Sequence, residues 1–207
     1  MAPSEPIRCE PRRSRLGLAA LTGVLAVLAG CLEVAAPKVT DGIEVRDVKT
    51  APGMELASAC VPTGMELCFD ALDNNCNGVI DEGCGLRTGV LQFTVAWQEA
   101  GADVDLNVNG PDGDIAHLEQ PNESGLMKDR DCPGTDNLCY GQNVENVFLA
   151  EGSPRRGRYR VVVRLENLND ATSPVKVRLS ARIGQRHFSS VVELAEKSDQ
   201  REFEFTL

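Results

Sequence analysis

The sequence has few aromatic residues and very few histidines, and both shortages restrict the class of protein. Aromatics make up 4% of the 207 residues and Trp97 is the single tryptophan, so the core has to be built mainly from valine, leucine and isoleucine. His117 and His187 are the two histidines, and neither G-x-S-x-G nor H-E-x-x-H occurs. We therefore predict a non-enzymatic protein in which each histidine is a surface strand residue.

The sequence also lacks an apolar run long enough to span a bilayer comfortably. Leu16 to Leu28 is apolar and follows four arginines, which is typical of an export signal over residues 1–30. Leu28-Ala29-Gly30-Cys31 resembles a bacterial lipobox, and the resemblance implies lipidation of Cys31, with two or more acyl chains for stable anchoring. The alternative is an ordinary cleavage site with an incidental cysteine. Leu32 is not the aspartate of inner-membrane retention, which favours the outer membrane of a bacterial envelope.

Basic residues are in the minority once the signal is removed. The signal carries four arginines and two glutamates, so the mature chain has 17 basic and 29 acidic residues and a formal charge of −12. This charge argues against nucleic acid and anionic lipid surfaces as partners. It suits solubility or the binding of cations.

Six cysteines remain in the exported chain after Cys9 leaves with the signal and Cys31 takes the lipid. An even number in an oxidising compartment predicts three disulfides. Their candidates are Cys60, Cys68, Cys76, Cys84, Cys132 and Cys139. The last two are expected to close a local loop, while the pairing of the first four stays open. Their eight-residue spacing lacks the short knuckles of a tetrahedral zinc site, which argues against zinc.

From Leu86 onward apolar and polar residues alternate with a period of two, and no long helical period occurs. Examples are residues 91–97, 104–108, 158–165 and 175–183. Such alternation predicts strands with one dry and one wet face, and the turn signals between them favour an antiparallel β-sandwich over 86–207. Residues 31–59 read as the lipidated cysteine and a flexible tether, with a small hairpin around Asp41-Gly42 as the alternative. Residues 60–85 form a separate cysteine-rich segment.

The cysteine-rich segment contains a regular series of oxygen-bearing side chains. Oxygens recur at alternate positions from Asp73, and Gly78 stands at the sixth position of the series. Calcium loops are built in this way. The predicted ligands are Asp73, Asn75, Asn77, the Val79 carbonyl, Asp81 and Glu82. The twelfth position is Cys84 and not glutamate, so the loop is not an EF-hand; Glu82 or Asp70 could supply the missing oxygen.

The stretch E-L-C-F-D-A-L-D-N-N-C-N-G-V-I-D-E-G-C resembles the short Cys/Asp/Asn-rich metal-binding motif of exported myxobacterial proteins. Phe69-Asp70-Ala71 stands where Asp-Gly is commoner. The resemblance implies a metal, and the family has been linked to copper. Oxygen ligands fit Ca²⁺ better, because copper prefers imidazole and sulfur and both histidines lie outside the motif. The alternatives are a disulfide-rich loop whose Asp and Asn only make turns, or a softer metal such as copper.

A second acidic group follows in the sandwich. Asp103, Asp105 and Asn107 are expected on one outer strand face, with K-D-R-D at 128–131 and Glu145 further on. With Gly157-Arg158-Tyr159-Arg160-Val161, the pattern over 88–207 resembles a bacterial domain of unknown function similar to the prepeptidase C-terminal β-sandwich. The resemblance implies a sandwich and a possible second metal site at Asp103, Asp105, Asp129, Asp131 and Glu145. Solvated strand acids are the alternative.

Together these features predict a membrane-anchored exported lipoprotein that binds a divalent cation, with calcium favoured over copper. Its expected role is that of a cell-surface structural or ligand-binding module. The expected partners are the membrane, through the lipid, and an extracellular protein or polysaccharide that the sequence does not name. Two alternatives stay open: an accessory or inhibitory module for a secreted protease or polysaccharide-active enzyme, and a copper-binding surface protein.

Overall fold

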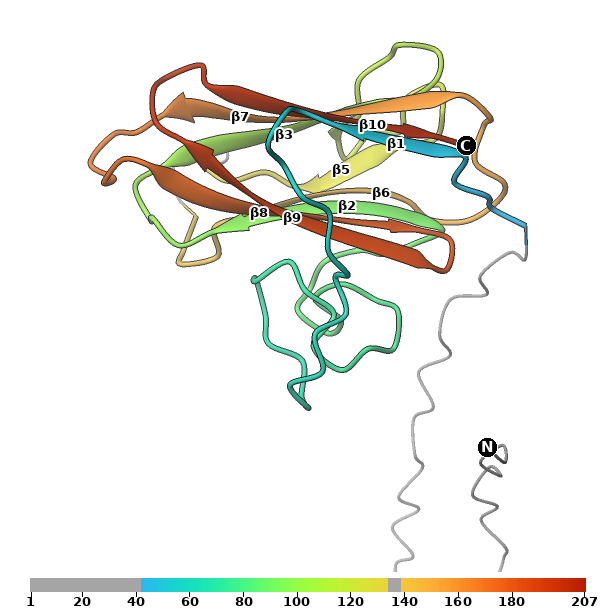
Figure 1. Cartoon of the computed structure of the whole chain (residues 1–207), viewed down its shortest axis with the longest axis horizontal. Coiled ribbons are helices and arrows are strands. Elements are labelled where there is room, and N and C mark those ends of the chain that lie inside the picture. The colour runs from blue at the N-terminus through green and yellow to red at the C-terminus, as the bar shows by residue number, and fades with distance from the viewer. Residues whose placement is uncertain (1–41, 134–138) are drawn as a thin grey trace, which may run out of the picture. The chain divides into compact units, whose positions relative to one another are not determined.

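A computed structural model describes residues 42–133 and 139–207 of the chain. These residues belong to one compact unit and form two β-sheets without a helix, which confirms the predicted all-β sandwich. Figure 1 shows the sheets face to face, with the cysteine-rich loops projecting beside the sheet that contains β2, β8 and β9. The strands are β1 (Asp47–Thr50), β2 (Leu91–Trp97), β3 (Asp103–Asn109), β4 (His117–Leu118), β5 (Met127–Arg130), β6 (Val144–Leu149), β7 (Arg158–Asn167), β8 (Val175–Ile183), β9 (Arg186–Leu194) and β10 (Gln200–Thr206).

The two sheets have a clear strand order. Sheet A runs β1-β10-β7-β3 and sheet B runs β4-β5-β6-β2-β8-β9. The paired strands are antiparallel except β4 and β5, which are parallel. The short parallel pair is a departure from the predicted antiparallel arrangement. It lies within 117–143, a stretch of the sequence without sustained alternation of apolar and polar residues.

The core lies between the inner faces of the two sheets. Val104, Leu106 and Val108 of β3 are fully buried, while the alternating Asp103, Asp105 and Asn107 are half-buried. Valine, leucine and isoleucine fill most of this core, as the scarcity of aromatics requires. Two of its aromatic side chains are in contact, since the rings of Phe93 and Phe205 have centroids 5.8 Å apart.

The outer face of sheet B is not wet throughout, in contrast to the expected alternation. Every residue of β2 and β6 is buried, and the polar side chains of Gln92, Thr94 and Asn146 are inaccessible to solvent. These side chains bond to one another, with the Thr94 hydroxyl donating to Asn146 Oδ1 at 2.7 Å and Gln92 Nε2 donating to the same oxygen at 3.2 Å. The cysteine-rich segment covers them, as described below.

The predicted tether has to be shortened. Residues 47–50 form β1 at the edge of sheet A, paired with β10, and Ala57 exchanges two backbone hydrogen bonds with Ser189 of β9. A four-residue strand of modest alternation carries too weak a signal to be found without its partner. The signal peptide, Cys31 and residue 41 of the alternative hairpin lie outside the described residues. No helix in the described part of the chain is long and apolar enough to cross a membrane.

Candidate metal centre

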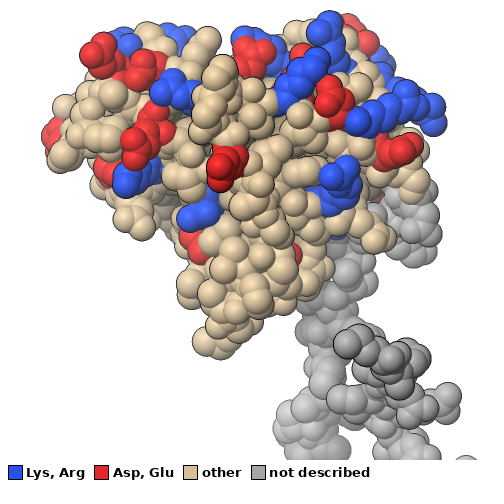
Figure 2. Space-filling model, in the orientation of Figure 1, with Lys and Arg blue, Asp and Glu red and all other residues tan. Residues whose placement is uncertain are grey.

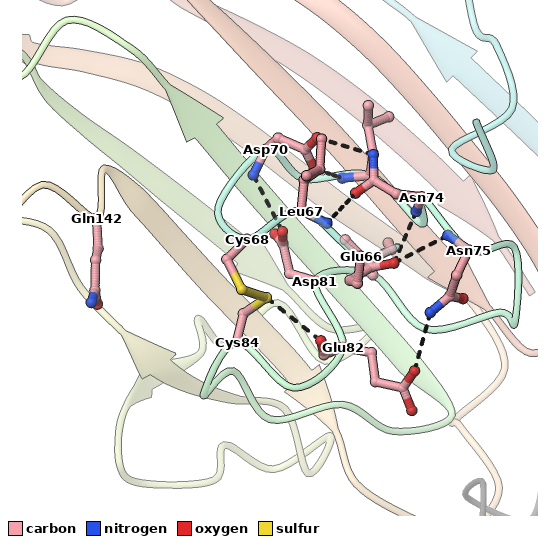
Figure 3. Close-up of a disulfide and its surroundings, with 12 residues drawn as sticks. Glu66, Leu67, Cys68, Asp70, Asn74, Asn75, Asp81, Glu82, Cys84 and Gln142 are labelled. Atoms are coloured by element: carbon pink, nitrogen blue, oxygen red, sulfur yellow. Dashed lines mark hydrogen bonds between the residues drawn. A yellow bond between two sulfur atoms is a disulfide. The ribbon is translucent and has the colours of Figure 1, made fainter. Parts of the chain in front are cut away.

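Two crossed disulfides frame the cysteine-rich segment. Cys60 bonds Cys76 and Cys68 bonds Cys84, and each pair is sixteen residues apart in sequence. The first cysteine therefore pairs with the third and the second with the fourth, so each disulfide closes a loop that contains an end of the other. Figure 3 shows Cys68 and Cys84 beside the polar side chains of the segment. The local disulfide predicted between Cys132 and Cys139 is also present.

Asp73 organises the predicted calcium loop from within. Its side chain is almost fully buried, and its two carboxylate oxygens accept the backbone N–H groups of Asn77 at 3.0 Å and Gly78 at 2.8 Å. Gly78 adopts a φ of 92°, a conformation that a side chain disfavours. The alternating Asp and the sixth-position glycine thus produce the sharp turn that the sequence predicts.

Three of the predicted ligands come together on the exposed side of the loop. The side-chain amides of Asn75 and Asn77 both donate to Glu82 Oε2, the former at 3.4 Å. The amide oxygens accept neighbouring backbone N–H groups, Asn75 from Asn77 and Asn77 from Val79. Asn75 and its bond to Glu82 are visible in Figure 3. The three side chains thus lie together with their amide nitrogens facing the Glu82 carboxylate. Amide and carboxylate groups also carry the oxygen donors that hard cations prefer.

Asp81 lies in a different environment from its neighbour Glu82. Its side chain is buried and accepts the N–H groups of Asp70 and Ala71 at 3.2 and 3.1 Å. Burial raises the pKa of Asp81 to about 7, although the hydrogen bonds favour the charged form. Asp70 accepts from Leu72 N and from the Asn74 side chain. Asp81 and Asp70 therefore both accept hydrogen bonds that fix the turn at residues 70–74, where the predicted calcium loop begins.

Glu66 is a member of the site that sequence reasoning missed. Its Oε2 accepts the N–H groups of Asn74 at 3.0 Å and Asn75 at 3.2 Å, and its Oε1 is buried without a hydrogen-bond partner. Burial raises the pKa of this carboxylate. The available signal was its place two residues before Cys68, at the start of the stretch that carries the resemblance to the metal-binding motif.

His187 reaches the loop from β9, although it is more than a hundred residues away in sequence. Its Nε2 lies 3.1 Å from the Gly78 carbonyl oxygen, and burial lowers the pKa of the ring. Both histidines lie outside the motif in sequence, as expected, but His187 contacts the motif in the folded structure. His117 is exposed, with its Nε2 3.9 Å from Asp114.

Polar groups of sheet B fasten the segment to its outer face. Gln92 Nε2 donates to the Ile80 carbonyl at 3.2 Å, and the Ser180 hydroxyl donates to the Ala71 carbonyl. Arg182 is buried on the same face, where the Asp73 charge acts on it. Ala71 also packs with Ala96 and Val144 in a small apolar cluster. These contacts explain why polar residues on the strands are buried.

The second acidic group is assembled around a lysine. Among the residues that the structure describes, Asp105, Asp131 and Glu145 are the group of three acidic, histidine or cysteine side chains whose ligand atoms lie within 4.8 Å of one another. Lys128 Nζ lies 2.9 Å from both Asp131 Oδ1 and Glu145 Oε2. Burial opposes ionisation of Asp131, but the ammonium outweighs it and lowers the pKa of that carboxyl. Lys128 thus supplies a positive charge beside three residues of the possible second metal site.

The remaining residues of the possible second metal site have separate roles. Glu145 is buried and also accepts the N–H of Leu106 at 2.6 Å, which fastens the free edge of β3 to sheet B. Asp129 is not in the group: it accepts from Arg87 N at 2.7 Å and from the Asn146 side chain at 2.6 Å. Burial, and then the charge of Asp105, raise the pKa of Asp103 to about 6.

Comparison with known proteins supports the first site. Residues 55–82 match the family model Cu-binding_MopE, described as a "Putative metal-binding motif". No curated protein matches the chain, and no solved structure does. The matched range contains three of the four cysteines of the disulfide frame and all six predicted ligands, so the comparison supports metal binding by this segment. The resemblance of residues 88–207 to the prepeptidase C-terminal type stays a prediction.

Proposed function

We propose that the protein is an exported lipoprotein, anchored through Cys31, that binds calcium in the loop 73–82 and serves as a non-enzymatic structural or ligand-binding module of the bacterial cell surface. The observation that carries the proposal is the convergence of Asn75, Asn77 and Glu82 on a loop that two disulfides hold in shape. The lipobox-like sequence supports export and anchoring in the outer membrane.

The donor set of the loop fits a hard cation. The six described cysteines are all in disulfides, so thiolate ligands are not offered there. Oxygen donors remain, from amides at 75 and 77 and from carboxylates at 66, 73 and 82. Glu66 Oε1 is buried without a partner, and an unpaired buried carboxylate oxygen is costly unless a cation or proton compensates it. Calcium, which takes six to eight oxygen ligands in flexible geometry, suits this set.

A melting experiment tests the cation. Residues 36–207, which form a compact unit of their own, are melted in excess calcium and in excess EDTA. We expect a higher melting temperature in calcium, because a ligand that binds only the folded state stabilises it. Glu82→Gln should reduce the difference, whereas Glu123→Gln, in an exposed loop, should leave it unchanged. An identical melting temperature in calcium and EDTA would refute calcium binding.

Copper is the second candidate, and His187 is the observation that favours it. An imidazole is a better ligand for copper than for calcium, and this one contacts the loop at Gly78. A copper site predicts tight binding that survives excess calcium and weakens strongly in His187→Gln. If copper binding is lost in excess calcium or is indifferent to His187, the copper reading is excluded.

A further inference from the structure

The end of the cysteine-rich segment carries an unusual concentration of exposed apolar side chains. We call residues 61–67, V-P-T-G-M-E-L, the apolar tip. Seven large hydrophobic side chains are exposed in the described part of the chain, and three of them lie in the tip: Val61, Met65 and Leu67. Met65 is 84% exposed, the highest value of the seven. Clustered exposure of this kind marks an interaction surface more often than isolated apolar residues do.

The tip presents almost no charge to its surroundings. Glu66 is its one charged residue, and the carboxylate of Glu66 is folded back onto the N–H groups of Asn74 and Asn75. Figure 2 shows a similar contrast on one face, since the lower end of the described part of the chain is tan, while blue and red side chains are numerous above it. A surface of this kind favours an apolar or interfacial environment over a charged partner.

The backbone of the tip is already hydrogen-bonded within the segment. Thr63 N and Gly64 N both donate to the Asn74 carbonyl, at 3.0 and 3.4 Å, and Leu67 N donates to Asn74 Oδ1 at 3.0 Å. The disulfides of Cys60 and Cys68 fix both ends of the tip. These N–H groups therefore stay paired when the tip leaves water, and the fixed ends keep the loss of conformational entropy small.

The length of chain outside the described structure points to the occupant. Ten residues, 32–41, separate the proposed lipid anchor at Cys31 from Gly42. They reach about 33–36 Å when fully extended, roughly the diameter of a domain of this size, so the tether permits any face to turn toward the membrane. An anchored domain meets the membrane at high effective concentration, where a small apolar surface is enough to bias its orientation.

We propose that the apolar tip inserts into the interfacial region of the membrane that holds the Cys31 anchor, and so fixes the orientation of the domain on that membrane. This inference rests on the anchor of the proposed function but not on the cation. The tip has no basic residue, so its contact is with the apolar boundary of the lipids and does not require anionic headgroups. Because this contact does not depend on anionic headgroups, the net negative charge of the mature chain does not oppose it.

Oxidation of Met65 tests this inference in the native protein. The full-length lipoprotein is purified from membranes, placed in phosphatidylcholine vesicles and treated with dilute peroxide, and each methionine is followed by mass spectrometry. Compared with residues 36–207 free in solution, Met65 of the anchored protein should be oxidised about fivefold more slowly, because the tether makes insertion an intramolecular step. Met127 and Met54, which lie outside the tip, should be oxidised at equal rates in both samples.

A pair of variants separates docking from other causes of protection. Leu67→Asp should restore the solution rate at Met65, whereas Val191→Asp, at an exposed valine of β9, should not; melting curves verify that both variants fold. Equal Met65 rates in anchored and free protein would overturn the proposal. The proposal would also be overturned if Met65 of free residues 36–207 became protected from oxidation as the protein concentration rises, because a second copy of the chain would then cover the apolar tip.

The same experiment tests the lipid anchor independently of docking. The mass of the peptide that begins at Cys31 shows whether acyl chains are attached. A lipidated Cys31 together with an unprotected Met65 overturns docking and leaves the proposed anchor intact. An unlipidated Cys31 removes the anchor and, with it, the basis for docking.

Discussion

Asp103 lies on the outer face of β3, half-buried and beside other acids. Burial first, and then the charges of Asp105, Glu166 and Asp131, raise its pKa from 3.8 to about 6. The folded state therefore binds this proton more tightly than the unfolded state does. The stability that it contributes is present below pH 4 and is lost as the pH rises through 6.

Replacing Asp103 by asparagine should thus stabilise the protein at high pH only. We expect Asp103→Asn to unfold at a higher urea concentration than the unmodified protein at pH 8, and at the same concentration at pH 4. Asp47→Asn, at an exposed aspartate of β1, is the matched control and should have no pH-dependent effect. A stabilisation by Asp103→Asn that is equal at the two pH values would contradict the raised pKa.

Lys128 provides the second prediction at this scale. The side chain is 10% exposed and lies between the carboxylates of Asp131 and Glu145. Lys128→Met leaves two partly or fully buried carboxylates without a positive charge, and we expect it to lower the free energy of unfolding by about 3–5 kcal/mol. Urea unfolding at pH 7 measures the loss.

A double-mutant cycle shows whether the loss comes from the ion pair. Glu145→Gln removes the charge but keeps an oxygen that can accept the Leu106 N–H. The double variant Lys128→Met/Glu145→Gln should be at least about 1 kcal/mol more stable than Lys128→Met alone, since coupled neighbours are not additive. If the two substitutions add, the lysine is not the cation of this acidic group.

At the scale of elements, the crossed disulfides should matter for the site as well as for stability. Cys60→Ser/Cys76→Ser opens a loop of sixteen residues, and chain entropy predicts a loss of about 3 kcal/mol. The loop 73–82 then loses one side of its frame, so calcium should no longer raise the melting temperature. Cys132→Ser/Cys139→Ser is the control: it should lower the melting temperature but preserve the calcium effect. A calcium effect that survives loss of the Cys60–Cys76 bond would show that the frame is dispensable.

Much of the architecture could be predicted from the sequence because strand periodicity is a local property. The alternation in β3, β7 and β8 gives the core face directly, and the glycine and oxygen spacing of 73–82 gives the turn. β1 could not be predicted, since its stability comes from β10, which is far away in sequence. The outer face of sheet B was wrongly predicted to be exposed for the same reason. Gln92 and Asn146 are polar, which suggests contact with solvent, but the cysteine-rich segment that covers them is distant in sequence.

The site was predicted in part for a related reason. Spacing identifies residues that share a short loop, and it identified Asp73, Asn75, Asn77 and Glu82 together. It cannot separate Asp81 from Glu82, because consecutive side chains of a turn can enter different environments. Nor can it reveal His187, which reaches the loop only through the packing of β9 beneath it.

At the scale of the whole molecule, the cysteine-rich segment and the sandwich share their buried polar groups. Gln92 and Ser180 of the sheet donate to carbonyls at Ile80 and Ala71 of the segment. If the segment separated, the polar residues beneath it would be rehydrated and their bonds to Ile80 and Ala71 would be lost. We therefore expect residues 36–207 to unfold in a single transition, with a calorimetric enthalpy of roughly 110–120 kcal/mol near 60 °C and equal to the van't Hoff enthalpy. Removing calcium should move this whole transition to lower temperature. Two transitions in the calorimeter, of which only the smaller responds to EDTA, would instead show that the metal segment is an independent appendage.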